Sequence, residues 1–330
     1  MPLPSKPTRI RQTEQRYRLR TKNLVQQCRK QLQLPHHEPM DYRRFVGWLI
    51  GRKPGISRDT WRQYKASVVF FLDEEAQKGD PIAEEAKELL EGVDVSGCLK
   101  KTTKTSAKKQ KKVPLRDFRG IMKYLDNNPS PWSLDLERWI SSSLLTGLRP
   151  AEWAGTSFGF ADGEVALIVQ NAKATNGRAL GFSRHILLGG LTDDERDMIK
   201  EHVERANEWE QAQQYHKFYH GVAASMARVV RKIWPKRDTY PTLYSMRHQF
   251  AANAKASGFT REEIAALMGH AVDTTATEHY GRTTAGYDMI RVRPDPAEVA
   301  KVRQVYRGRN APPKPKALSP HPVPRPKDSE

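Results

Sequence analysis

Residues 242 to 282 contain three kinds of side chain that together can act on a phosphate diester. The guanidinium of Arg247 can bind two non-bridging phosphate oxygens at once, and the imidazole of His270 can support them. The phenol of Tyr280 can attack the phosphorus as a nucleophile. The same residues also fit the ordinary interfaces of a helical domain, and this segment alone does not separate the two interpretations.

The segment predicts two helices joined by a turn, because apolar residues recur at helical spacing on both sides of it. A Ser-Gly pair at 257–258 ends the first helix. Thr260, with Glu263 three residues later, is a capping box that opens the second. His270 follows that helix in a loop, at the opposite end of the unit from Arg247. The fold therefore decides whether these two side chains converge.

A second segment, residues 141 to 155, supplies another arginine. An apolar helix is stopped by Gly147, and Arg149 follows in the sequence T-G-L-R. A short helical turn after the next proline carries Glu152. T-G-L-R alone is a common sequence, so the segment gains meaning only together with the later motifs.

Taken in this order, T-G-L-R, R-H-x-F, L-M-G-H and a tyrosine ten residues on resemble the tyrosine recombinase, or phage integrase, family. The resemblance covers residues 114 to 293 and, more loosely, the helical region before them. It implies a site-specific DNA recombinase, with a helical core-binding domain and a catalytic domain. The implied catalytic residues are the arginines Arg149 and Arg247, the β-hairpin lysine Lys173, His270 and the nucleophile Tyr280.

Two positions depart from the family pattern. Tyr244 stands three residues before Arg247, where the family usually has a histidine. A phenol there can hydrogen-bond a phosphate oxygen, but it cannot carry a proton near neutral pH as imidazole does. The tyrosine also comes one residue later than in the commonest spacing, so that His279 falls where the nucleophile often lies. Tyr280 is the assigned nucleophile, and Tyr287 is the alternative.

The resemblance implies a reaction through a covalent protein–DNA link. The tyrosine forms a 3′-phosphotyrosyl bond, and Lys173 gives a proton to the departing 5′-oxygen. No cofactor or metal is expected, because the link keeps the energy of the broken bond. The implied partners are double-stranded DNA, a homo-tetramer on two duplexes, and directionality or host DNA-bending factors. The implied role is integration or excision of a mobile element.

Two other functions fit the same residues. A DNA-binding accessory protein with an inactive remnant of the site would explain the charge, and Tyr244 is the feature that points to it. A type IB topoisomerase uses a similar set of residues and would relax plasmid DNA that lacks a recombination site. A regulator or structural chromatin protein would need none of the motifs, and their joint order argues against it.

Composition favours a polyanionic partner. The 330 residues carry a net charge of +18, and the mean hydropathy is −0.74. No apolar run approaches the length of a membrane span, and the first residues lack the apolar core of a signal peptide. Cys28 and Cys98 are too few for a disulfide framework, and the histidines show no metal-ligand spacing. We therefore expect a cytoplasmic protein with no metal, and the resemblance implies that it is nucleoid-associated and of bacterial or phage origin.

Charge and pattern predict a mainly α-helical protein with a small antiparallel β-sheet, in five parts. These are a basic N-terminal arm on DNA phosphates (1–37), a helical domain (38–95), a lysine-rich linker (96–113), a larger domain (114–307) and a disordered proline-rich tail (308–330). The resemblance implies that the helical domain is a SAM-like core-binding domain and that the larger one is the catalytic domain. The expected DNA contacts before the catalytic domain are Arg58, Arg62 and Lys65 on a helix, and Lys100, Lys101 and Lys104 in the linker.

Within the catalytic domain, helices are expected at 115–125, 133–145 and through 191–234. Short strands are expected at 157–160, 164–170 and 181–188, with a turn at Asp162-Gly163 and with Lys173 between the last two. A last short helix is expected between residues 295 and 306. The helical stretch 191–234 carries a further set of expected phosphate contacts: Arg228, Arg231 and Lys232.

Overall fold

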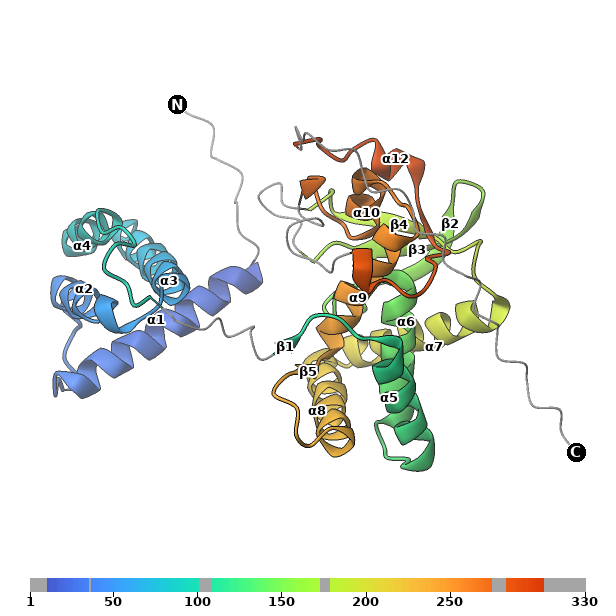
Figure 1. The fold of residues 1–330 in the computed structure, drawn as a ribbon. Coiled ribbons are helices and arrows are strands. Elements are labelled where there is room, and N and C mark those ends of the chain that lie inside the picture. The colour runs from blue at the N-terminus through green and yellow to red at the C-terminus, as the bar shows by residue number, and fades with distance from the viewer. Residues whose placement is uncertain (1–10, 36, 101–108, 173–178, 275–282, 306–330) are drawn as a thin grey trace, which may run out of the picture. The chain divides into compact units, whose positions relative to one another are not determined.

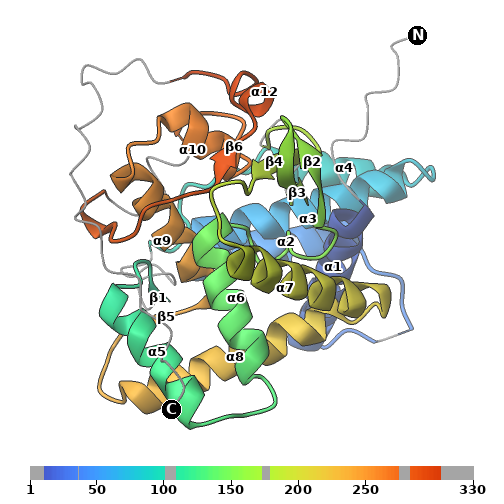
Figure 2. The same cartoon turned by 90° about the vertical axis from the view of Figure 1, so that its right-hand side faces the viewer.

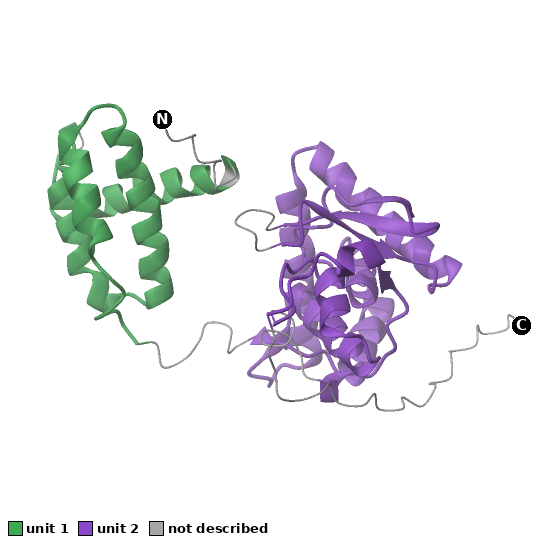
Figure 3. Cartoon of the chain, turned by 90° about the horizontal axis from the view of Figure 1, so that it is seen from above, with its two compact units in different colours: residues 1–104 green, residues 105–330 purple. Residues whose placement is uncertain are grey.

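The computed structural model describes residues 11–35, 37–100, 109–172, 179–274 and 283–305. The chain forms two compact units, residues 1–104 and 105–330, which are described separately (Figure 3). Helices dominate, and the sheets are small, which confirms the predicted fold class. Within the described ranges, no helix combines the length and the apolar character that crossing a membrane requires.

Unit 1 is a bundle of helices, several of which start at a residue whose side chain caps the first turn. They are α1 (Arg11–Gln31), α2 (Tyr42–Gly51), the 3-10 turn η1 (Lys53–Gly55), α3 (Arg58–Ala76) and α4 (Pro81–Glu91) (Figure 1). The Ser57 hydroxyl accepts a hydrogen bond from the backbone N–H of Thr60 at 3.3 Å. Asp80 accepts one from Ile82 at 2.9 Å. These side chains satisfy N–H groups that have no partner inside the helix.

Helix α1 belongs to the core of unit 1, and this corrects its assignment to a separate N-terminal arm. Leu24 and Cys28 are buried in the same cluster as Phe45 and Trp61. Thr21 donates to the carbonyl of Ser67 at 2.9 Å, which ties α1 to α3. The basic composition of the helix conceals an inward face of residues three and four positions apart. Leu19 of the same helix is 60% exposed and lies outside this core.

Unit 2 is built around α6, which packs against α5, α7, α8 and α9 (Figure 2). The helices and 3-10 turn of this unit are α5 (Leu115–Asn127), α6 (Ser133–Thr146), α7 (Asp193–Gln211), α8 (Tyr215–Ile233), α9 (Leu243–Ala256), α10 (Arg261–Leu267), η3 (Thr283–Ala285) and α12 (Pro296–Val299). Trp139 of α6 and Phe250 of α9 lie fully buried in the shared core. The helical stretch expected at 191–234 is two helices, α7 and α8.

The sheet of unit 2 is antiparallel, in the order β2-β3-β4-β6. Its strands are β2 (Ser157–Ala161), β3 (Glu164–Gln170), β4 (Ser183–Leu187) and β6 (Arg293–Pro294). Asp162 and Gly163 have φ of 49° and 77°, and such positive angles are those of the tight turn predicted between β2 and β3. A second, parallel pair joins β1 (Lys109–Gln110) to β5 (Tyr240–Pro241). Sequence patterns did not predict β1, β5 or β6, each of which is two residues long.

Two predicted segments differ from the structure. The last helix, α12, spans 296–299 instead of extending toward 306, and Val305 is 56% exposed. The ends of the segment predicted as a linker pack onto the two units: Cys98 is buried in the core of unit 1, and Val113 in that of unit 2. Residues 101–108 lie outside the described ranges.

Candidate phosphate-binding site

The turn after α6 places the first arginine of the site. Gly147 ends α6 with a φ of +67°, a left-handed conformation that suits glycine. The carboxylate of Glu152 accepts a hydrogen bond from the backbone N–H of Arg149 at 2.8 Å, and it also forms an ion pair with the Arg149 guanidinium. Glu152 therefore holds both the backbone and the side chain of Arg149.

Helix α9 delivers the second arginine into the same place. Arg247 is 0% exposed and donates hydrogen bonds of 2.6 Å to the carbonyls of Gly147 and Met268. Both acceptors lie where helices end, so the guanidinium satisfies carbonyls that lack partners in α6 and α10. Its Nη1 lies 3.7 Å from the Glu152 carboxylate. Arg149 and Arg247, 98 positions apart in the sequence, thus converge on one carboxylate.

His270 joins this cluster through the turn that follows α10. Its Nε2 lies 3.2 Å from Nη2 of Arg247, and its backbone N–H donates to Ala265 at 2.8 Å. Gly269, with a φ of +63°, makes the turn possible. A Cβ at this position would meet Arg184 Nη1 at 2.7 Å, so only glycine lets the turn approach the cluster so closely.

Arg184 of β4 is a third buried arginine that the sequence did not reveal. Its Nη2 donates to the Glu152 carboxylate at 2.9 Å, and its Nε donates to the carbonyl of Leu267 at 2.9 Å. Its Nη1 donates to Asn171. In the predicted strand, Arg184 and Ile186 point to the same face, since alternate residues of a strand share a face. This alternation, which places Arg184 on the same face as the apolar Ile186, was the signal that an arginine faces the core.

Among the described residues, the cluster carries an excess of positive charge, because three guanidiniums share the carboxylate of Glu152. Burial alone would raise the pKa of Glu152, but Arg184, Arg247 and Arg149 outweigh it and lower that pKa. Burial lowers the pKa of Arg184, and Glu152 acts in the opposite direction. A dry, net positive group of donors is the environment that stabilises a bound anion such as phosphate.

His270 is neutral in this environment. Burial, and then the neighbouring Arg247 and Arg149, lower its pKa to about 2. Because Arg247 can only donate, the Nε2 of His270 accepts and its proton lies on Nδ1. His270 can therefore donate a hydrogen bond to a phosphate oxygen or a phenol without adding charge to the cluster.

Two of the predicted catalytic residues, Lys173 and Tyr280, lie outside the described residues. Tyr244 lies in the first turn of α9, is 37% exposed and meets His248 edge to face, with ring centroids 5.3 Å apart. Tyr287, the alternative nucleophile, follows η3, and burial raises the pKa of its phenol. A phenol of raised pKa is harder to convert into the phenolate that attacks phosphorus.

The expected DNA contacts of unit 1 have different surroundings. Arg58 and Arg62 are exposed on α3. Lys65 is partly buried, and its ammonium donates to the carbonyls of Glu91 and Val93 at 2.7 and 2.8 Å. Lys65 therefore binds one carbonyl at the end of α4 and one just beyond it, which gives it a structural role in unit 1.

The remaining expected contacts are exposed where they are described. Lys100 is exposed, while Lys101 and Lys104 lie outside the described residues. On α8 of unit 2, the expected contacts Arg228, Arg231 and Lys232 are all exposed. Their spacing of three and four positions places Arg228 on the same side of the helix as the other two.

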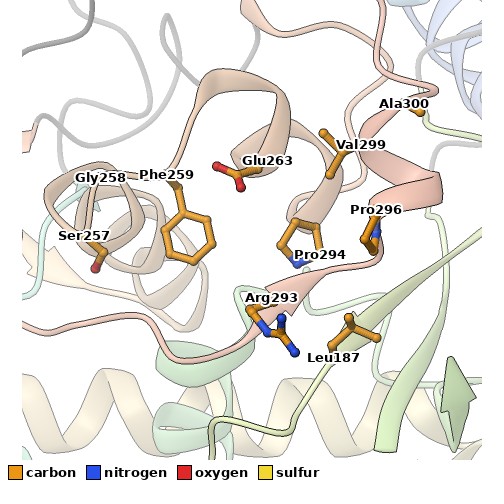
Figure 4. A pocket seen from close by; sticks show the side chains of 10 residues that line it. All are labelled: Leu187, Ser257, Gly258, Phe259, Glu263, Arg293, Pro294, Pro296, Val299 and Ala300. Carbon is orange, nitrogen blue, oxygen red and sulfur yellow. The ribbon is translucent and has the colours of Figure 1, made fainter. Parts of the chain in front are cut away.

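A pocket of about 680 Å³ lies elsewhere in unit 2, between the turn after α9, β6 and α12 (Figure 4). Figure 4 shows that Phe259, Pro294 and Val299 line it, with Glu263 and Arg293 as its charged residues. None of the residues of the arginine cluster lines this pocket. Its lining is largely apolar and lacks the converging donors that a phosphate would need.

No protein-family model matches the chain, and no curated protein matches it. Among solved structures, a lambda integrase dimer bound to a COC′ core site is similar at 15% identity and a TM-score of 0.48, covering 86% of this chain and 75% of that one. XerH site-specific recombinase bound to a difH substrate is 12% identical, with a TM-score of 0.42 and coverages of 72% and 67%. The Tn1549 transposon integrase, in complex with a circular intermediate DNA, is 16% identical, with a TM-score of 0.41 and coverages of 82% and 95%.

Proposed function

We propose that this protein is a tyrosine recombinase, a site-specific enzyme that cuts and rejoins DNA through a covalent 3′-phosphotyrosyl intermediate. One observation carries the proposal: Arg149 and Arg247, from distant parts of the chain, meet at Glu152, with His270 3.2 Å from Arg247. The motif order of the sequence and the net charge of +18 agree with a DNA substrate.

In the proposed reaction, the phenolic oxygen of Tyr280 attacks the phosphorus, and the bond from phosphorus to the 5′-oxygen breaks. Arg149 and Arg247 bind the non-bridging oxygens, where charge accumulates in the transition state. Losing one such donor raises the barrier by about 3–4 kcal/mol in comparable sites. His270 donates a neutral hydrogen bond, and Lys173 protonates the leaving 5′-oxygen. The free 5′-hydroxyl later attacks the phosphotyrosine and restores the DNA.

The remaining roles follow from the same proposal. Tyr244 takes the place of the usual histidine and supplies a hydrogen bond to the phosphate from the first turn of α9. Glu152 is structural, because it positions the arginines and does not itself contact the phosphate. Unit 1 acts as the core-binding domain, and a homo-tetramer joins two duplexes. The biological reaction is integration or excision of a mobile element, with directionality or DNA-bending factors as partners.

A suicide substrate tests the nucleophile. Duplex DNA with a bridging 5′-phosphorothiolate at the cleavage site should trap a covalent protein–DNA adduct, visible as a shifted band after denaturing electrophoresis. Tyr280→Phe should lose the adduct, because the attacking oxygen is gone. Tyr287→Phe is the matched control and should keep it. An adduct that survives Tyr280→Phe and disappears in Tyr287→Phe would transfer the role to Tyr287.

Assays of the wild-type protein distinguish the proposed recombinase from the two alternative functions. A DNA-binding accessory protein would bind the duplex and form no adduct with wild-type enzyme. A type IB topoisomerase would relax supercoiled plasmid that lacks a recombination site, whereas a site-specific recombinase would not. Sequencing the DNA next to the gene should reveal the repeated ends of a mobile element. These ends would provide the DNA sequence for the cleavage substrate.

A further inference from the structure

One cluster of metal-ligating side chains lies where β4 meets β6. The register of these strands pairs Leu187 with Arg293 and Ile186 with Pro294, and one more step along it places His185 opposite Asp295. The Nδ1 of His185 lies 2.9 Å from an Asp295 carboxylate oxygen. Helix α12 begins directly after Asp295, so Glu298 lies about one turn further on the same side.

These three residues form a compact set of potential ligands. One ligand atom from each of His185, Asp295 and Glu298 lies within 4.8 Å of the other two. Ligands at about 2.0–2.2 Å from a zinc-like ion lie about 3–4 Å apart, so the set needs only a small contraction to close around one ion. The 110 positions that separate His185 from Asp295 explain why sequence spacing did not reveal it.

Glu298 supplies an independent reason to expect a cation. The residue is only 5% exposed, and its Oε1 accepts from Lys301 at 3.2 Å. Its Oε2 is buried and has no hydrogen-bond partner among the described residues. A buried carboxylate oxygen without a partner costs free energy, and a metal ion would satisfy it.

We propose that His185, Asp295 and Glu298 bind a divalent transition-metal cation such as Zn²⁺. An imidazole nitrogen with two carboxylate oxygens is a ligand set that zinc-class ions accept, and water can complete the coordination. Lys301 offsets part of the negative charge, but its side chain is 60% exposed and can move away from the ion. The ion would fasten α12 to β4 and so hold this end of unit 2 on the sheet.

The proposed ion lies on the other side of β4 from the arginine cluster. His185 and Arg184 are adjacent in the strand, and adjacent side chains of a strand point to opposite faces. Arg184 contacts Glu152, whereas His185 contacts Asp295. In Figure 4, Pro294 and Pro296, which flank Asp295 in the chain, line the neighbouring pocket. The ion therefore has a structural role that is separate from the proposed cleavage chemistry.

The test is metal binding by the untagged, chelator-treated full chain. Calorimetric titration with Zn²⁺ should show one equivalent bound and a raised Tm, and Co²⁺ should give a visible d–d absorption band. Glu298→Gln and Asp295→Asn should each weaken binding at least about tenfold. Both changes keep the side-chain shape, and asparagine can still cap α12 as Asp295 does. Glu204→Gln, an exposed carboxylate on α7, is the matched control and should bind like wild type.

Two outcomes would overturn the proposal. One is the absence of stoichiometric Zn²⁺ binding and of a Co²⁺ band in the wild-type protein. The other is a Glu298→Gln variant that binds Zn²⁺ as tightly as wild type, which would place the ion elsewhere. If a variant fails to fold, the Co²⁺ spectrum of the wild type still decides, because imidazole and carboxylate ligation differs from that of the hydrated ion. None of these measurements requires DNA or cleavage activity.

Discussion

Glu152 is the residue that keeps three buried arginines together. Its two oxygens contact the side chains of Arg149 and Arg184, and the guanidinium of Arg247 lies 3.7 Å away. Removing charges from water costs several kcal/mol per ion, and their mutual attraction must offset that cost. Glu152 thus offsets part of the positive charge that the three guanidiniums bring into the core.

Replacing Glu152 by glutamine should destabilise unit 2 by about 3–5 kcal/mol, because three buried guanidiniums would lose their shared counter-ion. Urea unfolding measures this difference. Glu201→Gln is the matched control: it removes the partner of Arg138 on a half-exposed carboxylate, and it should cost at most about 1 kcal/mol. Equal losses in the two variants would mean that Glu152 does not hold the cluster.

His202 gives the protein a pH-dependent stability. It lies in the core between Trp139 and Trp153, with ring centroids 5.1 and 4.5 Å away. Neither ring nitrogen has a hydrogen-bond partner within the described part of the chain. Burial, followed by Arg138, lowers the pKa of His202 from 6.5 to about 3. Below pH 6.5 the unfolded chain therefore binds a proton that the folded chain cannot.

His202→Phe should make unfolding less sensitive to acid. The stability that the neutral imidazole contributes is fully present above pH 6.5 and is lost as the pH falls toward 3, at about 1.4 kcal/mol per pH unit. In urea unfolding between pH 6.5 and 4, the free energy of unfolding of the variant should depend on pH less steeply than that of wild type, by the contribution of one proton. Trp139→Phe, which changes packing but no titratable group, should keep the wild-type slope. Identical slopes in wild type and His202→Phe would contradict the prediction.

At the scale of elements, the contact between the end of α6 and the side of α9 positions the site. Gly147 ends α6, and its carbonyl accepts the 2.6 Å hydrogen bond from Arg247. A Cβ at Gly147 would meet the ring of Phe250, including Cε1 at 2.7 Å. Glycine is needed here both for the left-handed backbone and for the close approach of α9.

Gly147→Ala should therefore destabilise unit 2 by more than the backbone strain alone. The backbone term is about 1–2 kcal/mol, and overlap with Phe250 adds about 1–3 kcal/mol. Gly163→Ala is the matched control, because Gly163 has a φ of +77° but no atom within 4 Å of the added Cβ, and it should show only the backbone term. Urea unfolding compares them. If both variants lost the same stability, α9 would not be held as closely as the structure shows.

Helix starts and turns that depend on side chains close in the sequence were predictable. The Thr260–Glu263 capping box marks a helix start that the structure confirms. The side chains of Ser57 and Asp80 cap α3 and α4 through equally local hydrogen bonds. The Asp162-Gly163 turn fixed the first hairpin. By contrast, the two-residue strands β1, β5 and β6 depend on partners distant in sequence, so no local pattern reveals them.

The candidate site was predictable in part. Arg149, Arg247 and His270 follow from motif spacing, and the structure brings them together. Arg184 was missed, because a single arginine in a short apolar strand resembles a surface residue until the strand's inward face is known. The packing of α1 was missed for a related reason: its basic surface dominates the composition, while its inward face is narrow.

At the scale of the whole molecule, the net charge of +18 makes binding to any polyanion favourable. Charge alone does not show where a polyanion such as the proposed DNA substrate would contact the protein, since a long-range field acts on all phosphates in a similar way. Direct contacts differ from this field because each one releases condensed counter-ions, and the release appears in the salt dependence of binding. The expected contacts on α8 can be tested by this difference.

A triple change of Arg228, Arg231 and Lys232 to glutamine should reduce the slope of log affinity against log salt concentration by about 2–3, because each lost phosphate contact removes about 0.9. Affinity for duplex DNA, measured by fluorescence anisotropy across a potassium chloride series, gives the slope. The control changes three exposed lysines on α5, α7 and α8, namely Lys123, Lys200 and Lys217, to glutamine.

Both triple variants lower the net charge by the same three units, so they weaken the long-range field of the protein equally. The difference between their slopes therefore measures direct phosphate contact alone. A steeper slope in the control than in the α8 variant would place DNA against Arg228, Arg231 and Lys232. Equal slopes would show that this end of α8 faces solvent in the complex, and that the contacts of unit 2 with the duplex lie elsewhere.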